Sequence, residues 1–143
     1  MEIKNKKAYF NYYVEDEIEA GIVLTGTEIK SVRNGSVNIK DSYIRIKNDE
    51  AYIINMYIAK YENGNIFNHD EYRERKLLLH KKQIRKLKDS ISQDSYTLIP
   101  LTVYLKSGKA KVSVGLCKGK KIYDKRQTIK ERDIIKSSYQ RIS

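Results

Sequence analysis

The amino-acid sequence predicts a mainly β protein made of one small domain and a basic tail. Segments in which apolar and polar residues alternate are numerous, and short polar turns separate them, as in antiparallel hairpins. Two short segments of the body repeat their apolar residues with helical spacing. About six strands and two or three short α-helices in a chain of 143 residues favour an antiparallel β-barrel of the oligonucleotide-binding type. A two-layer α+β sandwich is the alternative.

The N-terminal part is expected to contain two strand segments and a helix. Residues 9–14 and 18–24 are rich in aromatic and β-branched side chains, which favour extended backbone. The acidic residues 15–17 between them are expected to form a bend. A helix is expected over residues 27–33, because Asn34-Gly35 follows it and glycine readily adopts the left-handed conformation that ends many helices.

A first hairpin is expected in the middle of the chain. Residues 43–47 alternate, so that the isoleucines face one side and Arg45 and Lys47 face the other. The turn at 48–50 leads into residues 51–58. The side chains expected to share one face of this returning strand are Tyr52, Ile54, Met56 and Ile58.

A second hairpin is expected around the turn Lys106-Ser107-Gly108. The residues expected to share a face before this turn are Ile99, Leu101, Val103 and Leu105. Those expected to face inward after it are Val112, Val114 and Leu116. Pro100 lies inside the strand pattern, and because proline has no amide hydrogen to donate to a neighbouring strand, it is expected at an edge or a bulge.

The second helix is expected over residues 75–90. Apolar residues and one histidine recur there at spacings of three and four, on a stripe formed by Leu77, His80, Ile84, Leu87 and Ile91. The opposite face carries Lys81, Lys82, Arg85 and Lys88. This helix therefore belongs to a strongly basic segment, because residues 73–88 hold eight lysines and arginines and one acidic residue.

The charge is distributed unevenly along the chain. The net charge is +11, from 29 basic and 18 acidic residues. Residues 1–117 hold 20 basic and 15 acidic side chains, whereas residues 118–143 hold nine and three. We therefore expect a nucleic-acid-binding β domain over residues 1–117 and a basic tail over residues 118–143, because nucleic acid is the commonest polyanionic partner of such a chain. The tail is expected to be disordered alone.

Several classes of function are not expected. The apolar runs are short and the N-terminus lacks a hydrophobic stretch, so neither a membrane span nor classical secretion is expected, and the protein should be cytoplasmic. A single cysteine, Cys117, provides neither a disulfide nor a zinc site, and it is expected to pack inside a strand end. His80 lies on the apolar stripe of the expected helix and His69 in a polar loop, so neither is expected to be a catalytic acid or base. An enzyme is therefore not expected, and neither are a metal or a cofactor.

Seven blocks of the chain match a known family. They are Asn5-Lys-Lys-Ala8, Glu19-Ala-Gly-Ile22, Gly26-Thr-Glu-Ile-Lys-Ser31, Asp41-Ser-Tyr43, Arg73-Glu-Arg-Lys-Leu-Leu-Leu79, Gly119-Lys-Lys121 with Asp124-Lys-Arg126, and Ile129-Lys-Glu-Arg132. With these blocks in the same order, the chain closely resembles the small protein B family of bacterial SsrA-binding proteins. The resemblance covers nearly the whole sequence.

The resemblance implies a function in ribosome rescue. Members of the family bind the tRNA-like domain of transfer-messenger RNA (tmRNA, or SsrA RNA) with an oligonucleotide-binding barrel. They bring that RNA, charged with alanine and carried by elongation factor Tu, to stalled ribosomes, so that the nascent peptide is tagged for degradation. This role, called trans-translation, involves no covalent chemistry by the protein. A general RNA-binding or ribosome-associated protein is the alternative.

The resemblance also assigns residues to two RNA contacts. Those expected to contact tmRNA are Asn5, Lys6, Lys7, Glu19, Arg73, Arg75, Lys76, Leu78 and Lys111. Those expected to contact small-subunit ribosomal RNA at the decoding centre are Gly119, Lys120, Lys121, Tyr123, Asp124, Lys125 and Arg126. Tyr123 stands where some members have histidine.

A helix in the messenger channel of the ribosome is expected at the start of the last segment, over Thr128, Ile129, Lys130, Glu131 and Arg132. Thr128 and Glu131 have the spacing of a capping box, in which the two side chains satisfy free amides at a helix start. Ile135, Tyr139 and Ile142 follow at helical spacing. A helix of about 14 residues is marginal without tertiary packing, so we expect it to form on its partner.

Overall fold

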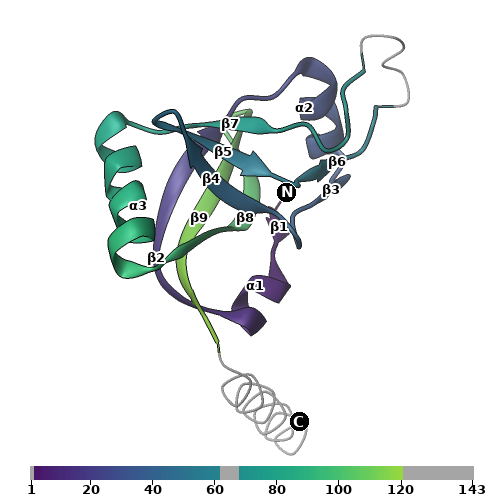
Figure 1. The fold of residues 1–143 in the computed structure, drawn as a ribbon. Helices are drawn as coiled ribbons and strands as arrows, with labels where there is room; N and C mark the ends of the chain where they lie inside the picture. The colour runs from purple at the N-terminus through teal and green to yellow at the C-terminus, as the bar shows by residue number, and fades with distance from the viewer. Residues whose placement is uncertain (1, 62–67, 121–143) are drawn as a thin grey trace, which may run out of the picture.

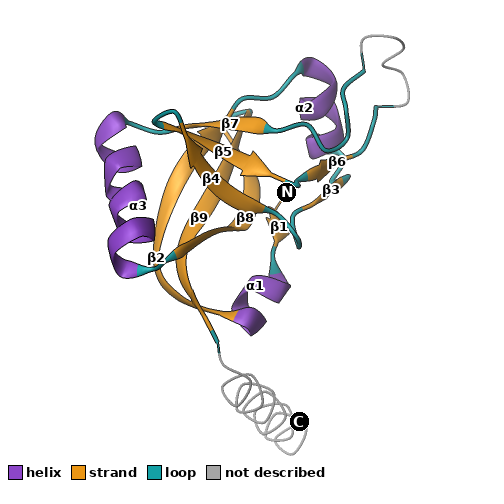
Figure 2. Cartoon of the chain, in the orientation of Figure 1, coloured by secondary structure: helices purple, strands orange, loops and turns teal. Residues whose placement is uncertain are grey.

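The computed structural model describes residues 2–61 and 68–120 (Figure 1). Strands dominate these residues (Figure 2), which confirms the mainly β class. The strands are β1 Glu2–Lys4, β2 Tyr12–Ile22, β3 Val37–Asn38, β4 Tyr43–Lys47, β5 Glu50–Ile54, β6 Tyr57–Ile58, β7 Arg75–Leu78, β8 Thr97–Lys106 and β9 Lys109–Gly119. The helices are α1 Lys6–Asn11, α2 Gly26–Arg33 and α3 Lys81–Asp94.

Seven strands form one antiparallel sheet in the order β1-β8-β9-β2-β7-β5-β4, and β3 pairs with β6 separately. The sheet curls on itself, and β4 contacts β8 near the opposite edge (Figure 1). Among the described strands, no hydrogen-bonded pairing joins β4 to β1 or β8. The sheet is therefore barrel-like, but closure of the expected barrel is not shown.

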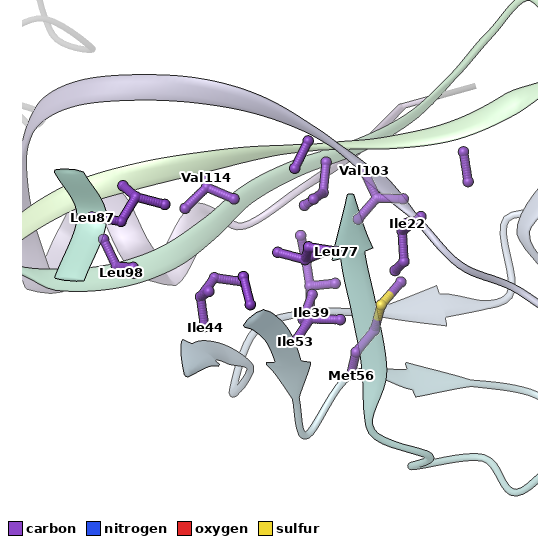
Figure 3. Close-up of a cluster of buried hydrophobic side chains, with 14 of the residues drawn as sticks. Ile22, Ile39, Ile44, Ile53, Met56, Leu77, Leu87, Leu98, Val103 and Val114 are labelled. Carbon is purple, nitrogen blue, oxygen red and sulfur yellow. The ribbon is translucent and has the colours of Figure 1, made fainter. Parts of the chain in front are cut away.

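The concave side of the sheet encloses the hydrophobic core (Figure 3). Val103, Val112 and Val114 contribute to it from the second hairpin, which confirms their inward orientation. Helix α3 covers one end of the sheet, with Ile84 and Leu87 both 2% exposed. Helix α2 begins one residue earlier than expected, after a capping box between Thr25 and Glu28.

The second helix was predicted to begin at Arg75, and this is wrong. Residues Arg75–Leu78 form strand β7 instead, because their backbone pairs with β5 on one side and with β2 on the other. Arg75 and Leu77 are buried, whereas Lys76 and Leu78 are exposed, as period-two alternation requires. Leu77 and His80 have helical spacing in the sequence, but Leu77 lies in strand β7 and His80 is the N-cap of α3.

The expected face of the first hairpin changes partway along the chain. Tyr52 and Ile54 share the half-buried face of β5, as expected, whereas Ala51 and Ile53 are buried on the other face. Asn55 then takes a φ of 63°, which ends the strand. Met56 and Ile58 are buried because this break reverses the alternation, so the expectation that they share a face with Tyr52 and Ile54 is wrong.

A bulge in β8 divides the predicted inward residues of the second hairpin. The register shifts between Pro100 and Thr102, which confirms the bulge expected at the proline. Ile99 and Leu101 consequently join a separate cluster with Ala8 and Cys117, beneath α1. The expectation that Ile99 and Leu101 share a face with Val103 is therefore wrong.

Strand β2 also differs from the prediction. Tyr9 lies in α1 and not in a strand. The acidic bend is a register shift between Val14 and Asp16 within one continuous strand. A bulge lets the chain continue its pairing with β9 while it changes direction, so no turn is needed there.

Candidate RNA-binding face

A row of four side-chain positions crosses the convex face of the sheet. Tyr104 of β8 lies opposite Lys111 of β9, Lys111 lies opposite Gly21 of β2, and Gly21 lies opposite Leu78 of β7. Residues directly opposite each other on neighbouring strands point to the same face. Glu19 precedes Gly21 by two residues and therefore points to this face too.

Gly21 leaves the space that Leu78 occupies. A Cβ atom on Gly21 would lie 3.3 Å from Cβ and 3.4 Å from Cδ1 of Leu78. Leu78 thus lies over the backbone of β2, and yet it remains 57% exposed. An exposed leucine held over a strand provides an apolar surface for a ligand at little entropic cost.

A surface hollow of about 410 Å³ lies beside Leu78. We call it the Leu78 hollow, and its lining is Glu19, Gly21, Leu78, Leu79, His80, Gln83 and Lys111. Three residues predicted to contact RNA, which are 59 and 33 positions apart along the chain (Glu19 to Leu78 and Leu78 to Lys111), therefore meet in one place. The hollow presents an apolar wall, a carboxylate and an ammonium group, which can accept a ribose or base, a hydroxyl or amino donor, and a phosphate respectively.

A second hollow of about 310 Å³ adjoins the other side of Leu78. Its lining is mostly apolar and includes Ile22, Val23, Leu24, Ile29 and Ala110. Leu78 and Lys111 contribute to both hollows. Leu78 is therefore a wall that a ligand can contact from two sides.

The carboxylate of Glu19 is held by its neighbours. The hydroxyl of Tyr104 donates to Oε2 of Glu19, and Nζ of Lys106 lies 3.6 Å from Oε1. The hydrogen bond from Tyr104 is the largest cause that lowers the pKa of Glu19, and Lys106 and Lys111 lower it further. Glu19 is therefore a charged hydrogen-bond acceptor near neutral pH.

Asn5 lies away from this hollow and is only 2% exposed. Its side-chain amide donates to the carbonyls of Ile39 and Pro100 at 3.1 and 3.0 Å, and its oxygen accepts from the N–H of Ala8 at 3.2 Å. The burial of Asn5 contradicts the predicted direct contact with RNA. Its side chain instead joins the N-terminus of α1 to β8.

Arg75 is also removed from the predicted RNA contacts, because its side chain is fully buried. It donates from Nε to Glu28 and from Nη1 to the carbonyl of Met56. Arg73 donates to the other oxygen of Glu28 at 2.7 Å and is 37% exposed. We call Glu28, Arg73 and Arg75 the Glu28 cluster. A guanidinium that water does not reach cannot contact a phosphate, so the prediction for Arg75 is wrong.

The remaining predicted lysines of the body are exposed. Nζ of Lys7 lies 2.9 Å from Asp41, and Nζ of Lys76 lies 3.6 Å from Glu50. Lys6 is exposed in the first turn of α1. Exposed ion pairs of this kind are weak, so Lys7 and Lys76 can exchange their carboxylate for a phosphate.

The C-terminal contacts are described only at their start. Gly119 ends β9, two residues beyond the expected boundary of the β domain. Lys120 donates from its backbone N–H to the carbonyl of Asn11 at 2.9 Å, and its Nζ lies 4.9 Å from the ring centre of Tyr13. The expected residues outside the described ones are Lys121, Tyr123, Asp124, Lys125, Arg126, Thr128, Ile129, Lys130, Glu131 and Arg132.

His69 and Cys117 are both buried. His69 is 6% exposed and shares hydrogen bonds with Thr27 and the carbonyl of Ile58, each 2.9 Å long. Cys117 is buried, as expected, and this burial raises the pKa of its thiol to about 11. Within residues 2–61 and 68–120, no three acidic, cysteine or histidine side chains gather as metal ligands.

Sequence reasoning missed Gly21, Tyr104 and Lys106 as parts of the site. Gly21 lies within a matching block but carries no side chain that suggests a role. Tyr104 is one of 12 tyrosines in the sequence, and the alternation pattern does not distinguish it from the others. Their positions depend on how four strands pair in register. The alternation of residues within a single strand does not reveal that register.

Comparison with known proteins identifies the family. A family model described as SmpB protein matches residues 2–143. The chain belongs to the SmpB family. The SmpB family relatives include the SsrA-binding protein of Desulfitobacterium hafniense (strain DSM 10664 / DCB-2), which is 57% identical over 129 residues, or 90% of this chain and 83% of the relative. The SsrA-binding protein of Staphylococcus aureus (strain Newman) is 57% identical over 131 residues, or 92% of this chain and 85% of the relative.

A solved structure of an SmpB protein is also similar. It is described as "tmRNA-SmpB: a journey to the center of the bacterial ribosome", with a TM-score of 0.71 and 44% sequence identity. The match covers 85% of this chain and 85% of the other. In the part of the chain that the structure describes, no helix is both long and apolar enough to span a membrane.

Proposed function

We propose that this chain binds tmRNA and acts as the adaptor of trans-translation. It delivers alanyl-tmRNA, carried by elongation factor Tu, to stalled bacterial ribosomes in the cytoplasm, so that the trapped peptide is tagged for degradation. The observation that carries the proposal is the meeting of Glu19, Leu78 and Lys111 in one hollow. Membership of the SmpB family and the relatives named SsrA-binding proteins support it.

The chemistry of the Leu78 hollow suits a folded RNA with an unstacked nucleotide. Leu78 offers 57% of its surface to a base or ribose. Lys111 can neutralise a phosphate, and the Glu19 carboxylate can accept from a ribose hydroxyl or a base amino group. Such a combination reads the shape of an RNA loop as well as its charge, which distinguishes it from a general basic surface.

The second part of the proposal concerns the C-terminal segment. Residues 118–143 carry a net charge of +6, so they can contact a second polyanion while the β domain holds tmRNA. We assign them to small-subunit ribosomal RNA at the decoding centre and in the messenger channel. The protein itself makes and breaks no covalent bond in this role.

Binding to tmRNA and to an ordinary elongator tRNA at the same salt concentration tests the first part. We expect much tighter binding to tmRNA, with a steep dependence on salt from several phosphate contacts. Equal affinity for both RNAs would favour a general RNA-binding protein. A Leu78→Ala variant should reduce the affinity for tmRNA by a larger factor than the affinity for tRNA.

A tagging assay in reconstituted translation tests the second part. The triple variant with Asp124, Lys125 and Arg126 replaced by alanine should retain its affinity for tmRNA and lose peptide tagging on stalled ribosomes. Removal of residues 118–143 should give the same result. If either change abolished tmRNA binding, the division between the β domain and the C-terminal segment would be wrong.

A further inference from the structure

The Leu78 hollow contains the carboxylate of Glu19, whose direction is determined by side chains of another strand, β8. Glu19 lies on β2 with a side chain that is 42% exposed. An exposed glutamate ordinarily samples several rotamers, and ordering it costs entropy. Here the hydroxyl of Tyr104 donates to Oε2, while Lys106 lies 3.6 Å from Oε1. Both carboxylate oxygens therefore have partners on β8.

The backbone of the sheet makes this contact reproducible. Glu19 lies opposite Ser113 on β9, and Tyr104 lies opposite Lys111, two residues along the same strand. The tyrosine and glutamate thus reach each other diagonally across β9, at the distance that long side chains span on one face of a sheet. Tyr104 is only partly exposed, so its ring is held in place by the sheet.

We propose that Tyr104 is a positioning residue for RNA binding, because its hydroxyl holds the Glu19 carboxylate in one direction at the edge of the Leu78 hollow. The proposal rests on the proposed function, in which Glu19 accepts a hydrogen bond from RNA. Lys106 assists by placing a positive charge beside the same carboxylate. This charge reduces the repulsion between Glu19 and the phosphates that approach Lys111.

The arrangement explains how a carboxylate can serve in a site for a polyanion. A freely rotating Glu19 would repel phosphates from every rotamer and would have to be ordered on binding. A carboxylate that already accepts from Tyr104 keeps lone pairs available for a donor on the RNA. The conformational entropy of the Glu19 side chain is then lost when the protein folds and not when the RNA binds.

The test is the variant Tyr104→Phe, which removes the hydroxyl and retains the ring. We expect its affinity for tmRNA to fall roughly three- to tenfold, the effect of one net hydrogen bond. The salt dependence should stay unchanged, because no phosphate contact is lost. The matched control is Tyr43→Phe, on strand β4 at an edge of the sheet, which should bind as the unaltered protein does.

A double-mutant cycle with Glu19→Ala separates positioning from direct contact. If Tyr104 acts through Glu19, Tyr104→Phe causes no further loss of affinity in the Glu19→Ala background. If the two losses multiply, Tyr104 contacts RNA by itself and the proposal is overturned. If Glu19→Ala leaves binding unchanged, the assignment of Glu19 in the proposed function fails, and the positioning role fails with it.

The titration of Glu19, followed by NMR, is a readout that a merely structural role would not change. The groups that act on the Glu19 carboxylate are Tyr104 and Lys106 of β8 and Lys111 of β9, and Glu17 of β2 acts on the Tyr104 hydroxyl. Removing the hydroxyl should raise the pKa of Glu19, because the hydrogen bond from Tyr104 is the largest cause that lowers it. An unchanged pKa together with unchanged tmRNA affinity would overturn the proposal while leaving the proposed function intact.

Discussion

The Leu78 hollow and the Glu28 cluster are built from the same kinds of side chain, and they differ in access to water. In the hollow, Glu19 and Lys111 lie at the surface beside an exposed leucine. In the cluster, Glu28 and Arg75 are 0% exposed and satisfy each other. Both regions contain residues that the family resemblance assigned to RNA. The comparison teaches that burial, and not charge alone, decides which basic residues can meet an RNA.

The largest expected effect is in the Glu28 cluster. Glu28→Ala should destabilise the fold by about 3–5 kcal/mol, because it leaves the buried guanidinium of Arg75 without its partner. Urea unfolding measures this change. The matched control is Glu74→Ala, since Glu74 is exposed and pairs with Lys47 at 3.3 Å, and the control should cost about 1 kcal/mol or less. Equal effects of the two substitutions would remove the distinction between the buried and the exposed region.

The pH dependence of stability provides a second test of the same cluster. Burial raises the pKa of Glu28, but hydrogen bonds from Arg73, from the N–H of Thr25 and from Arg75 lower it by more, so the folded pKa lies below the unfolded value. The stability that Glu28 contributes is therefore present above its unfolded pKa of about 4.3 and is lost as the pH falls through the folded pKa. Glu28→Gln should reduce this acid dependence of the unfolding free energy. An identical dependence would show that Glu28 titrates alike in both states.

In the hollow, the expected effects are on binding and not on stability. Leu78→Ala and Lys111→Ala should each weaken tmRNA binding by about 1–2 kcal/mol, as base contacts and charged hydrogen bonds do. Only Lys111→Ala should lower the magnitude of the salt slope, by about one. A loss of thermal stability comparable with that of Glu28→Ala would mean that the hollow also supports the fold.

The smallest expected effect comes from Gly21→Ala. The added Cβ would approach Leu78 to 3.3 Å, so this exposed side chain should move by a few tenths of an ångström. We expect tmRNA affinity to fall by about 0.5–1 kcal/mol, because a small displacement loses part of the dispersion contact. The matched control is Gly26→Ala, since a Cβ there meets no atom within 4 Å. Equal binding by both variants would show that the space above Gly21 is unimportant.

Much of the fold could be predicted from local patterns. The turns at Asn48-Asp49 and Ser107-Gly108 have positive φ angles, which polar residues and glycine tolerate, and alternation around them indicated both hairpins. Strand β7 could not be found in this way, because Leu77 and the following residues also match helical spacing. The pairing of β7 with β5 and β2 decides its conformation, and such long-range pairing is not encoded in one segment.

The candidate site was predicted in part, and by resemblance. Composition and charge indicated a nucleic-acid partner, but neither could select Glu19 among the acidic residues. The resemblance selected Glu19, Leu78 and Lys111, which the sheet brings together. It also selected Asn5 and Arg75, whose buried hydrogen bonds hold α1 and β7 in place. A family motif therefore contains buried residues that support a surface as well as exposed residues that belong to it.

Strand β9 contributes to the hollow at one end and meets α1 at the other. Lys111 lines the hollow. Lys120, just beyond the last residue of the strand, donates its backbone N–H to the carbonyl of Asn11. At about 3.3 Å per residue, these two lysines stand at most roughly 30 Å apart. The length of the strand therefore sets the separation between the Leu78 hollow, where we propose that tmRNA binds, and Lys120 at the start of the C-terminal segment. Inserting two residues into β9 would change that separation while preserving the alternation of its faces.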